Sequence, residues 1–517
     1  MAKARNLSSE TPRPKLDYDR DFAKFTPRQL EAVHQLDSGK IKFLLYGGAL
    51  GGGKSYFLRY LAPRFLIKMF EKKGIKHVPI MLACEDYPSL KDRQLAKIAT
   101  EFPPWLGKNH SDHKDYGRSF VLHEDFGSGV VCFRNLDDAS KYASAEFAAI
   151  LVDELTKNHY ETFTHLRTRL RYPGFEDIEC PFVAGTNPGG VGHGFCKQFW
   201  IDKIFPPEFQ YPIDYRELFG YVPSKAEDNP HLDPAYWNML FTLPEHLRKP
   251  FREGDWTIFV GQMFNLSKYH IINPMPVPDW AQIYFTFDWG FGAPFSCGWW
   301  WTDTEGRVFR FAEWYGWNGT PNTGLRLSDP EIAKGIIDKE KSMGLKNRDR
   351  IVRLAGPDCF SKKPNYMGGG QGPATAEIFA ENGLLLSPGD AKRELKIRQF
   401  QSRLAIPTDP VTKMPSGIPM MQIYSSCEQF LRTIPNLIND KHNIEDIDTT
   451  GEDHVYDEAC HIAMARPMAI KMPPRKELSM FEKDLMIIRG EDPHQYEPES
   501  SSGAGKVFSE DSYSIMS

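Results

Sequence analysis

Apolar positions divide the chain into two blocks in which strand-like and helix-like segments alternate. The strand-like runs of the first block are short and rich in β-branched and aromatic residues: 42–46, 78–84, 148–152 and 182–185. Helix-like stretches separate them, which is typical of a mostly parallel sheet covered by helices. A Pro-rich segment at 273–279 interrupts this pattern, and new strand-like runs follow at 282–287 and 297–302. The pattern therefore predicts two α/β domains.

The length of 517 residues agrees with two domains, because single hydrophobic cores rarely grow to this size. We place the first domain at 25–265, a linker at 266–279 and the second domain at 280–470. The polar ends, 1–24 and 471–517, are predicted to be flexible tails, since they contain little to bury.

Composition is that of a soluble globular protein, with 41% hydrophobic and 25% charged residues. The chain contains neither an apolar run of the roughly 18 to 20 residues that cross a bilayer nor an apolar signal-peptide core. We therefore expect no membrane association and a location in the cytoplasm. The 8 cysteines are scattered singly, which favours reduced structural thiols over a zinc site or disulfides.

A net charge of −5 argues against DNA binding by bulk positive charge, so any DNA contact must come from local patches. One candidate is the loop 361–372, where Lys362 and Lys363 lie beside a run of glycines. The other is a group of basic residues in a helix-like segment: Lys392, Arg393, Lys396, Arg398 and Arg403. A surface loop and a solvated helix face are the alternatives.

The strongest local motif is a phosphate-binding loop of the pattern G-x-x-x-x-G-K-[ST]. It follows a strand-like run and precedes a helix-like stretch at 56–70, and it contains Gly48, Gly51, Gly52, Gly53, Lys54 and Ser55. Glycines allow backbone N–H groups to point at phosphates, and the helix N-terminus adds partial positive charge. We expect this loop to bind ATP with Mg²⁺, with Lys54 on the β- and γ-phosphates and Ser55 on the metal.

An acidic pair, Asp153 and Glu154, ends the apolar run at 148–152. Asp153 is expected to help hold Mg²⁺ and Glu154 to polarise the attacking water. A strand followed by an acidic helix start would look the same, but the preceding phosphate loop favours the catalytic interpretation.

Gln29 has two interpretations that the sequence leaves open. It lies three residues after Thr26, with Pro27 between them, and so completes a capping box. A glutamine upstream of the loop strand could also bond the adenine edge of ATP.

Three separated aspartates in the second block could hold two metal ions. Asp288 ends a strand-like run, Asp358 follows the apolar residues 351–355, and Asp457 lies in a helix-like stretch. Two-metal sites need several carboxylates from different elements, with the ions about 4 Å apart. The alternative is that these residues are solvated, as most acidic residues are.

His454 lies three residues before Asp457, so both would share one face of a helix. It is a candidate metal ligand or proton-transfer group, although a lone histidine is often structural. Asp453 and Glu313 are further carboxylates that could join this site or only lie nearby.

Together these motifs resemble the large terminase subunits of tailed phages. In the first block the similar features are the glutamine motif, the acidic pair and three short segments: 169–171, 185–188 and 254–256. In the second block they are 287–292, 356–358, 443–448 and 452–459. The residues 458–461 depart from the pattern that many relatives carry, which leaves the local packing open. The resemblance implies a P-loop NTPase domain followed by an RNase H-like nuclease domain.

The resemblance also implies roles for individual residues. Thr186 and Asn187 would sense the γ-phosphate and couple hydrolysis to DNA movement, although the sequence alone favours a simple Asn-Pro-Gly turn. Asp288, Asp358 and Asp457 would be metal ligands, with His454 as a further candidate. An arginine finger is expected, and its candidates are Arg134, Arg169 and Arg171.

The function that the resemblance implies is viral genome packaging. ATP hydrolysis would drive double-stranded DNA into a procapsid through its portal protein, and a nuclease with two Mg²⁺ or Mn²⁺ ions would cut the concatemer. The implied partners are viral DNA, the portal, a small terminase subunit and other copies of the chain in a ring. The protein would act in the host cytoplasm, docked transiently on the procapsid, and would be missing from the mature virion.

Two other functions fit parts of the sequence. One is a P-loop helicase or remodelling ATPase whose second domain binds nucleic acid without cutting it. The other is an assembly protein that uses ATP as a structural ligand. Neither needs both Glu154 and the three aspartates.

Overall fold

The computed structural model describes residues 17–465, apart from 207–208, 210–214, 244–247, 258–260, 346–349, 364–370, 391, 410–411, 413, 441–442 and 444–445. The tail expected at 471–517 and most of the one at 1–24 lie outside the described residues. So do parts of the loop 361–372 and of the segment 443–448.

The first domain is built on a sheet of eight strands in the order β3-β4-β5-β2-β6-β7-β1-β8. The strands are β1 (Phe43–Gly48), β2 (Pro79–Cys84), β3 (Gly107–His113), β4 (Gly117–Leu122), β5 (Val130–Asn135), β6 (Ile150–Asp153), β7 (Phe182–Thr186) and β8 (Phe219–Ser224). Along this order, every neighbouring pair from β5 through to β8 at the far edge is parallel. The pairs β3–β4 and β4–β5 at the other edge are antiparallel. Every residue of β1, β2, β6 and β7 is buried, as expected of parallel strands covered on both faces.

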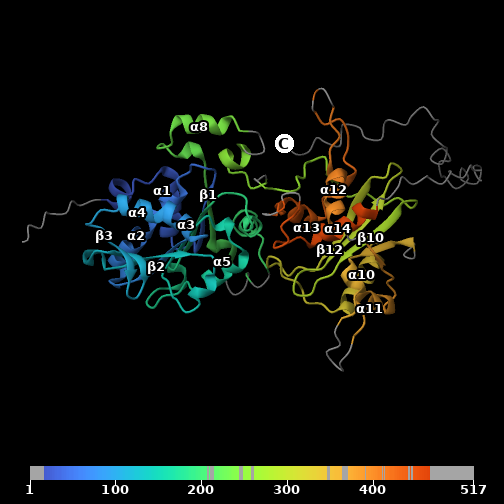
Figure 1. The fold of residues 1–517 in the computed structure, drawn as a ribbon, viewed down its shortest axis with the longest axis horizontal. Helices are drawn as coiled ribbons and strands as arrows, with labels where there is room; N and C mark the ends of the chain where they lie inside the picture. Colours follow the sequence, from blue (N-terminus) through green and yellow to red (C-terminus); the bar gives the residue numbers. More distant parts are fainter. Residues whose placement is uncertain are drawn as a thin grey trace, which may run out of the picture.

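Helices cover both faces of this sheet (Figure 1). They are α1 (Pro27–Asp37), α2 (Lys54–Lys73), α3 (Tyr87–Leu90), α4 (Ala96–Glu101), α5 (Tyr160–Arg167), α6 (His193–Cys196), α7 (Tyr215–Leu218) and α8 (Pro234–Phe241). Ordered packing begins before residue 25, because the helical turn Tyr18–Phe22 lies against α2. There the Tyr18 hydroxyl donates to the Tyr60 carbonyl at 2.9 Å, and Arg64 pairs with Asp19 at 2.6 Å.

The second domain contains a sheet of seven strands in the order β14-β13-β10-β11-β12-β15-β9. The strands are β9 (Ile271–Ile272), β10 (Gln282–Asp288), β11 (Ser296–Thr302), β12 (Val308–Tyr315), β13 (Val352–Ala355), β14 (Ser387–Pro388) and β15 (Met421–Tyr424). The pairs β10–β11 and β11–β12 are antiparallel, and the other four pairs are parallel. The α/β fold class predicted for both domains is confirmed.

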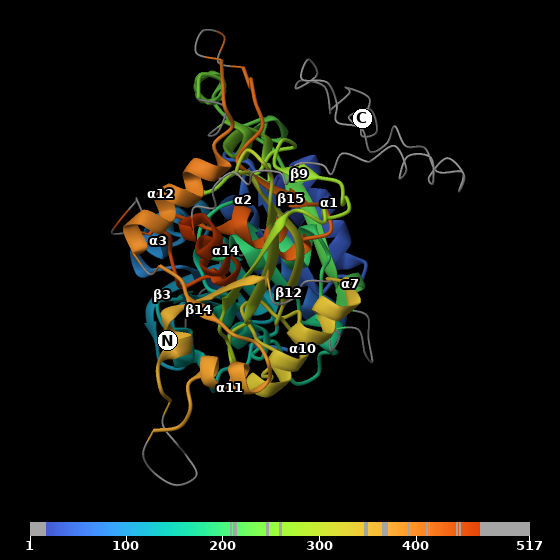
Figure 2. The same ribbon diagram turned by 90° about the vertical axis from the view of Figure 1, so that its right-hand side faces the viewer.

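Helices also lie on both faces of the second sheet (Figure 2). They are α10 (Asp329–Ser342), α11 (Thr375–Glu381), α12 (Arg393–Leu404), α13 (Glu428–Thr433) and α14 (His454–Ala465). Trp300 on one face packs with α12, α13 and α14, while Trp299 on the other packs with α10 and α11. This alternation of neighbouring residues follows from the two-residue period of a strand.

The two domains lie side by side (Figure 1) and contact each other directly. Gln198, in the helical turn Lys197–Ile201, donates through Nε2 to the carbonyl of Gly319 at 2.9 Å. All eight cysteines are buried and free, as predicted. Within the part of the chain that the structure describes, every helix is too short or too polar to span a bilayer.

Candidate functional site

Three parallel strands bring the candidate residues of the first domain to one edge of the sheet. Gly47 of β1 pairs with Thr186 of β7, and Asp153 of β6 pairs with Gly185 of β7. The phosphate loop, the acidic pair and the 186–187 segment therefore follow neighbouring strand ends, which is where open α/β sheets bind ligands. We call residues 48–55 with Asp153 and Glu154 the phosphate-loop site.

The phosphate loop is fixed by donors that bond its carbonyl oxygens. The hydroxyls of Tyr46 and Ser224 both donate to the Gly52 carbonyl at 3.0 Å, and Asn229 Nδ2 donates to the Gly51 carbonyl at 2.7 Å. A Cβ atom at Gly52 would lie 1.8 Å from the Ser224 hydroxyl oxygen, so only glycine fits. These bonds orient the loop without using the N–H groups of residues 51–53, which phosphate would need.

Lys54 is buried at the start of α2, and its Nζ donates to the Ala49 carbonyl at 2.6 Å. Burial lowers the pKa of this lysine, while the charges of Glu154 and Asp153 act in the opposite direction. A bound phosphate would supply a stronger acceptor than the carbonyl. Lys54 is thus held beside the loop by a contact that ATP can replace.

Asp153 is fully buried, and burial raises the pKa of its carboxyl. Its Oδ2 accepts from Gln94 Nε2 at 3.1 Å, and the same Nε2 donates to the Ser55 carbonyl at 3.3 Å. Its Oδ1 has no hydrogen-bond partner among the described residues. An orphaned carboxylate oxygen near Ser55 fits Mg²⁺, which prefers oxygen ligands.

Glu154 adopts a left-handed backbone conformation, with φ of 56°, which is rare for residues other than glycine. Strain of this kind is concentrated at functional sites. Burial raises the pKa of its carboxyl, whose Oε1 accepts from Asn187 Nδ2 at 3.4 Å. Asn187 thus lies next to the candidate catalytic glutamate, as the coupling interpretation requires.

Thr186 has a different environment. Its hydroxyl lies 2.7 Å from that of Thr156 and accepts from the Thr156 backbone N–H at 3.2 Å. It therefore ties the end of β7 to the segment after Glu154 and is buried with no exposed surface.

Gln29 serves the capping box and contacts the loop as well. Its Oε1 accepts from the Thr26 N–H at 2.9 Å, which completes the box, and its Nε2 donates to the Gly53 carbonyl at 3.1 Å. The capping interpretation is thus realised in the structure, and the same side chain lies beside the phosphate loop.

The three arginines considered from the sequence bond elsewhere within the chain. Arg134 donates to the Phe133 and Tyr116 carbonyls, Arg169 to the Ala143 carbonyl, and Arg171 pairs with Glu146. Arg93 also bonds within the chain, in an ion pair with Glu85, but its charge lowers the pKa of both Asp153 and Glu154.

Sequence reasoning missed Arg93, Gln94, Ser224 and Asn229. The first two lie in the helical turn Lys91–Leu95, and the others lie at the end of β8 and shortly after it. No motif marks them, because each acts through a contact with a distant segment. The segment 254–256 packs against the phosphate loop, since a Cβ at Gly254 would lie 2.7 Å from the Gly48 Cα.

In the second domain the three aspartates come from neighbouring elements. β10, which ends at Asp288, pairs in parallel with β13, and Asp358 follows β13 in the helical turn Pro357–Phe360. Asp457 lies in the first turn of α14, which packs against both strands. We call Asp288, Asp358, Asp457 and His454 the acidic site.

The carboxylates of the acidic site are close enough for their charges to affect one another. Burial raises the pKa of Asp288 to about 6; His454 opposes this shift, and the charges of Asp457 and Asp358 add to it. Burial and the charge of Asp457 likewise raise the pKa of Asp453 to about 7. Such mutual repulsion is relieved when a cation binds between carboxylates.

Two side chains that can carry positive charge lie next to the carboxylates of the acidic site. Asp457 Oδ1 lies 3.5 Å from Lys396 Nζ, and Asp288 Oδ2 lies 3.3 Å from His454 Nδ1. No group of three or more His, Cys, Asp or Glu side chains within the described residues is already arranged to hold a metal ion. The donor set nevertheless fits a hard divalent ion, because carboxylate oxygens dominate it.

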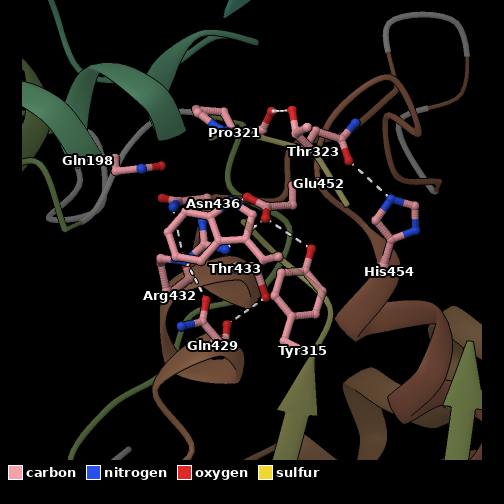
Figure 3. Close-up of polar contacts among 12 residues, drawn as sticks. Gln198, Tyr315, Pro321, Thr323, Gln429, Arg432, Thr433, Asn436, Glu452 and His454 are labelled. Carbon is pink, nitrogen blue, oxygen red and sulfur yellow. Dashed lines mark hydrogen bonds and ion pairs between the residues drawn. The ribbon is translucent and has the colours of Figure 1, made fainter. Parts of the chain in front are cut away.

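Two ion pairs, one fully buried and one partly exposed, fix α14 and the segment before it. Glu458 is fully buried and accepts from Arg310 Nη1 at 2.7 Å and from the Trp300 indole at 3.2 Å. Glu452 forms a two-bond pair with Arg432, at 2.7 Å for each bond, and accepts from the Tyr315 hydroxyl at 2.9 Å (Figure 3). The departure at 458–461 thus anchors the helix that carries Asp457.

The other carboxylate considered from the sequence, Glu313, has a structural role. It accepts from the backbone N–H groups of Gln429 and Phe430, at 2.6 and 3.1 Å, and so caps the start of α13. This arrangement favours the interpretation that it only lies near the site.

The basic patches divide between the site and the surrounding structure. Lys396 reaches Asp457, whereas Arg403 at the far end of α12 donates to the Gly306 carbonyl at 3.4 Å. Lys363 pairs with Asp329 at 3.3 Å and lies over the Trp289 ring at 3.8 Å. The side chain of Arg393 and residues 364–370 lie outside the described part of the chain.

The sequence matches no family model and no curated protein. Solved structures of phage large terminases are similar to it. One, from a thermophilic bacteriophage, shows 14% identity and a TM-score of 0.37, covering 85% of this chain and 98% of its own. One from bacteriophage HK97 shows 8% identity and a TM-score of 0.39, covering 86% and 94%.

A structure of the P22 large terminase nuclease domain covers 40% of this chain and 93% of its own, at 13% identity and a TM-score of 0.29. Two further structures of the terminase from the thermophilic bacteriophage contain ADP or ATP-gamma-S. At such identities and TM-scores, the function has to be argued from the residues of the two sites.

Proposed function

We propose that the chain is the large terminase subunit of a double-stranded DNA phage. Its first domain hydrolyses ATP to drive viral DNA through the portal into the procapsid, and its second domain cuts the concatemer to start and end packaging. The observation that carries the proposal is the presence in one chain of a phosphate loop with a complete Asp-Glu pair and of an acidic site at a second sheet edge. The motif resemblance to phage terminases supports it.

In the first domain each residue has a role that its position allows. Lys54 and the loop N–H groups bind the phosphates, Ser55 and Asp153 would hold Mg²⁺, and Glu154 orients the attacking water. Asn187 lies in the segment after β7 and donates to Glu154. A change in the position of the glutamate during ATP hydrolysis could therefore move this segment. Arg93 joins Arg134, Arg169 and Arg171 as a candidate for the arginine that stabilises charge, because its own charge acts on both Asp153 and Glu154.

In the second domain Asp288, Asp358 and Asp457 would hold two Mg²⁺ or Mn²⁺ ions, with His454 as a further ligand. Such ions polarise the scissile phosphate and lower the pKa of the attacking water. Lys396, beside Asp457, is placed to receive a phosphate once a metal neutralises that carboxylate.

The partners follow from the same proposal. They are viral DNA, the portal protein, a small terminase subunit and further copies of the chain in a ring. The protein would act in the host cytoplasm while docked on the procapsid. DNA binding should weaken steeply with salt, because phosphate contacts dominate it.

The test is conversion of supercoiled plasmid to cut products in Mn²⁺ or Mg²⁺. Wild type should cut, and Asp288→Ala and Asp358→Ala should not. Asp279→Ala, which changes an exposed aspartate of the linker, is the matched control and should cut normally. A folded wild-type protein that hydrolyses ATP but cuts with neither metal would favour the helicase-like alternative.

A further inference from the structure

The loop 316–324 links the acidic site to the first domain. It follows β12, and it is closed by a bond from the Trp317 indole to the Thr320 carbonyl at 2.6 Å and by one from the Asn318 N–H to the Thr323 carbonyl at 3.2 Å. Gln198 of the first domain bonds its Gly319 carbonyl. Figure 3 shows Pro321 and Thr323 of this loop between Gln198 and His454.

Asn322 in this loop contacts His454. Its Oδ1 lies 3.0 Å from His454 Nε2, while its Nδ2 donates to the Gly451 carbonyl at 3.3 Å. A carbonyl can only accept, so the bond to Gly451 fixes which end of the amide is nitrogen. The end that faces the histidine is therefore the oxygen, which can only accept a hydrogen bond from an Nε2–H group.

The direction of this bond determines how the imidazole is presented. With Nε2 carrying the proton, the nitrogen with a free lone pair in the neutral ring is Nδ1. Nδ1 lies 3.3 Å from Asp288 Oδ2. In the protonated ring Nδ1 donates to this carboxylate, whereas in the neutral ring its lone pair faces the carboxylate oxygen, an arrangement that suits a shared cation.

The backbone of Asn322 indicates that the residue is held in place. Its φ is 51°, a left-handed conformation in which asparagine is enriched but which glycine adopts more easily. A residue needed only for this turn could be glycine. The backbone therefore accepts either residue, and what asparagine adds at this position is its amide, which bonds His454 and Gly451.

We propose that Asn322 is a positioning residue of the nuclease site, which fixes the tautomer and orientation of His454 so that Nδ1 faces Asp288 and a bound cation. The inference rests on the proposed nuclease function. The loop 316–324, which the first domain contacts, would then hold a metal-site histidine in place. Carboxylates or carbonyls commonly have this role behind metal-bound histidines.

Two substitutions separate positioning from turn formation. Asn322→Gly removes the amide but eases the left-handed backbone, whereas Asn322→Asp keeps an acceptor oxygen and tolerates the turn. We expect Asn322→Gly to weaken both Mn²⁺ binding, measured by calorimetry without nucleotide, and plasmid cutting by about 10- to 100-fold. Asn322→Asp should restore most of both, and ATP turnover should be unchanged in each variant.

A second readout does not depend on activity. In the full chain labelled with ¹⁵N-histidine and studied at a pH that leaves the imidazole of His454 neutral, the His454 signals, identified by their loss in His454→Gln, should show the Nε2–H tautomer in wild type. They should shift toward mixed tautomers in Asn322→Gly. Unchanged His454 signals together with wild-type Mn²⁺ binding in Asn322→Gly would overturn the inference. A wild type that neither binds Mn²⁺ nor cuts DNA would refute the nuclease function, and the tautomer would still decide the role of Asn322.

Discussion

The phosphate-loop site and the acidic site are assembled in different ways. The first is centred on a contiguous loop, 48–55, whose carbonyls are bonded by Tyr46, Ser224 and Asn229, so the shape of the loop exists without ligand. The second joins three segments far apart in the chain, and its carboxylates are balanced by Lys396 and His454. The comparison indicates that bonds to the backbone preorganise the phosphate-loop site. The acidic site needs a cation and a well-anchored helix, α14, to complete it.

The largest effect should come from Glu154→Gln, which tests whether the preorganised site depends on one carboxylate. The amide keeps the size and the bond to Asn187 but cannot orient water as a base. We expect ATP turnover to fall by about 10²- to 10⁴-fold while ATP binding persists. Plasmid cutting without ATP should be unaffected. Turnover within threefold of wild type would remove Glu154 from the catalytic role.

The next effect tests the anchor of the acidic site. Arg310→Met leaves Glu458 buried without its cationic partner, which should destabilise the second domain by about 3–5 kcal/mol. Calorimetry should show a lower unfolding temperature for that domain, and ATP turnover at low temperature should be retained. Adding Glu458→Gln should recover much of the loss, because the fully buried charge is then removed, while Glu313, which also pairs with Arg310, keeps its bonds from the Gln429 and Phe430 N–H groups.

The matched control for this anchor is Arg307→Met, which breaks the ion pair of Arg307 with Asp303. The side chains of Arg307 and Asp303 are 20% and 12% exposed. Partly exposed pairs contribute about 0–1 kcal/mol. Equal losses for Arg310→Met and Arg307→Met would show that the buried pair does not anchor α14 as described.

A smaller effect is expected from Gln94→Leu, which removes the donor to Asp153 and Ser55. Outer contacts of metal ligands typically contribute about 10- to 100-fold to metal affinity. The Mg²⁺ concentration for half-maximal ATP turnover should therefore rise by about that factor. Gln422→Leu, at a buried glutamine of the second domain that donates to the Tyr269 carbonyl, should leave it unchanged. A lower turnover at saturating Mg²⁺ with no change in metal dependence would contradict this role.

These contrasts also explain what the sequence could predict. Local patterns predicted β1, β2, β6 and β7, because buried parallel strands are continuous apolar runs, and they also predicted β10 from its aromatic and β-branched residues. They also predicted the phosphate loop, where glycine spacing, strand and helix occur within one short segment. The strand β3 escaped detection, since it is a polar edge strand with exposed residues.

Contacts between distant segments could not be predicted in this way. Gln94 reaches Asp153 across 59 residues, and Glu458 reaches Arg310 across 148. Nothing near either residue in the sequence indicates its partner, and the arginine candidates were limited to Arg134, Arg169 and Arg171 for the same reason. The pairing of β10 with β13, which brings Asp288 and Asp358 together, likewise follows from topology.

The smallest effect concerns the bond between the domains. Gln198 is buried and donates from one Nε2 to the carbonyls of Gly319 and Ile204, at 2.9 and 3.2 Å. Gln198→Leu keeps the bulk but removes both bonds, at a cost of about 1 kcal/mol for each. Because Gly319 belongs to the loop that carries Asn322, amide hydrogen exchange within 316–324 should become faster, and plasmid cutting should fall by less than in Asn322→Gly. ATP turnover should stay close to wild type, since Gln198 does not contact the phosphate-loop site in any bond described. Unchanged exchange in 316–324 would mean that the two sites are independent units that share a chain, whereas faster exchange would show that the preorganised domain helps to hold the acidic site in place.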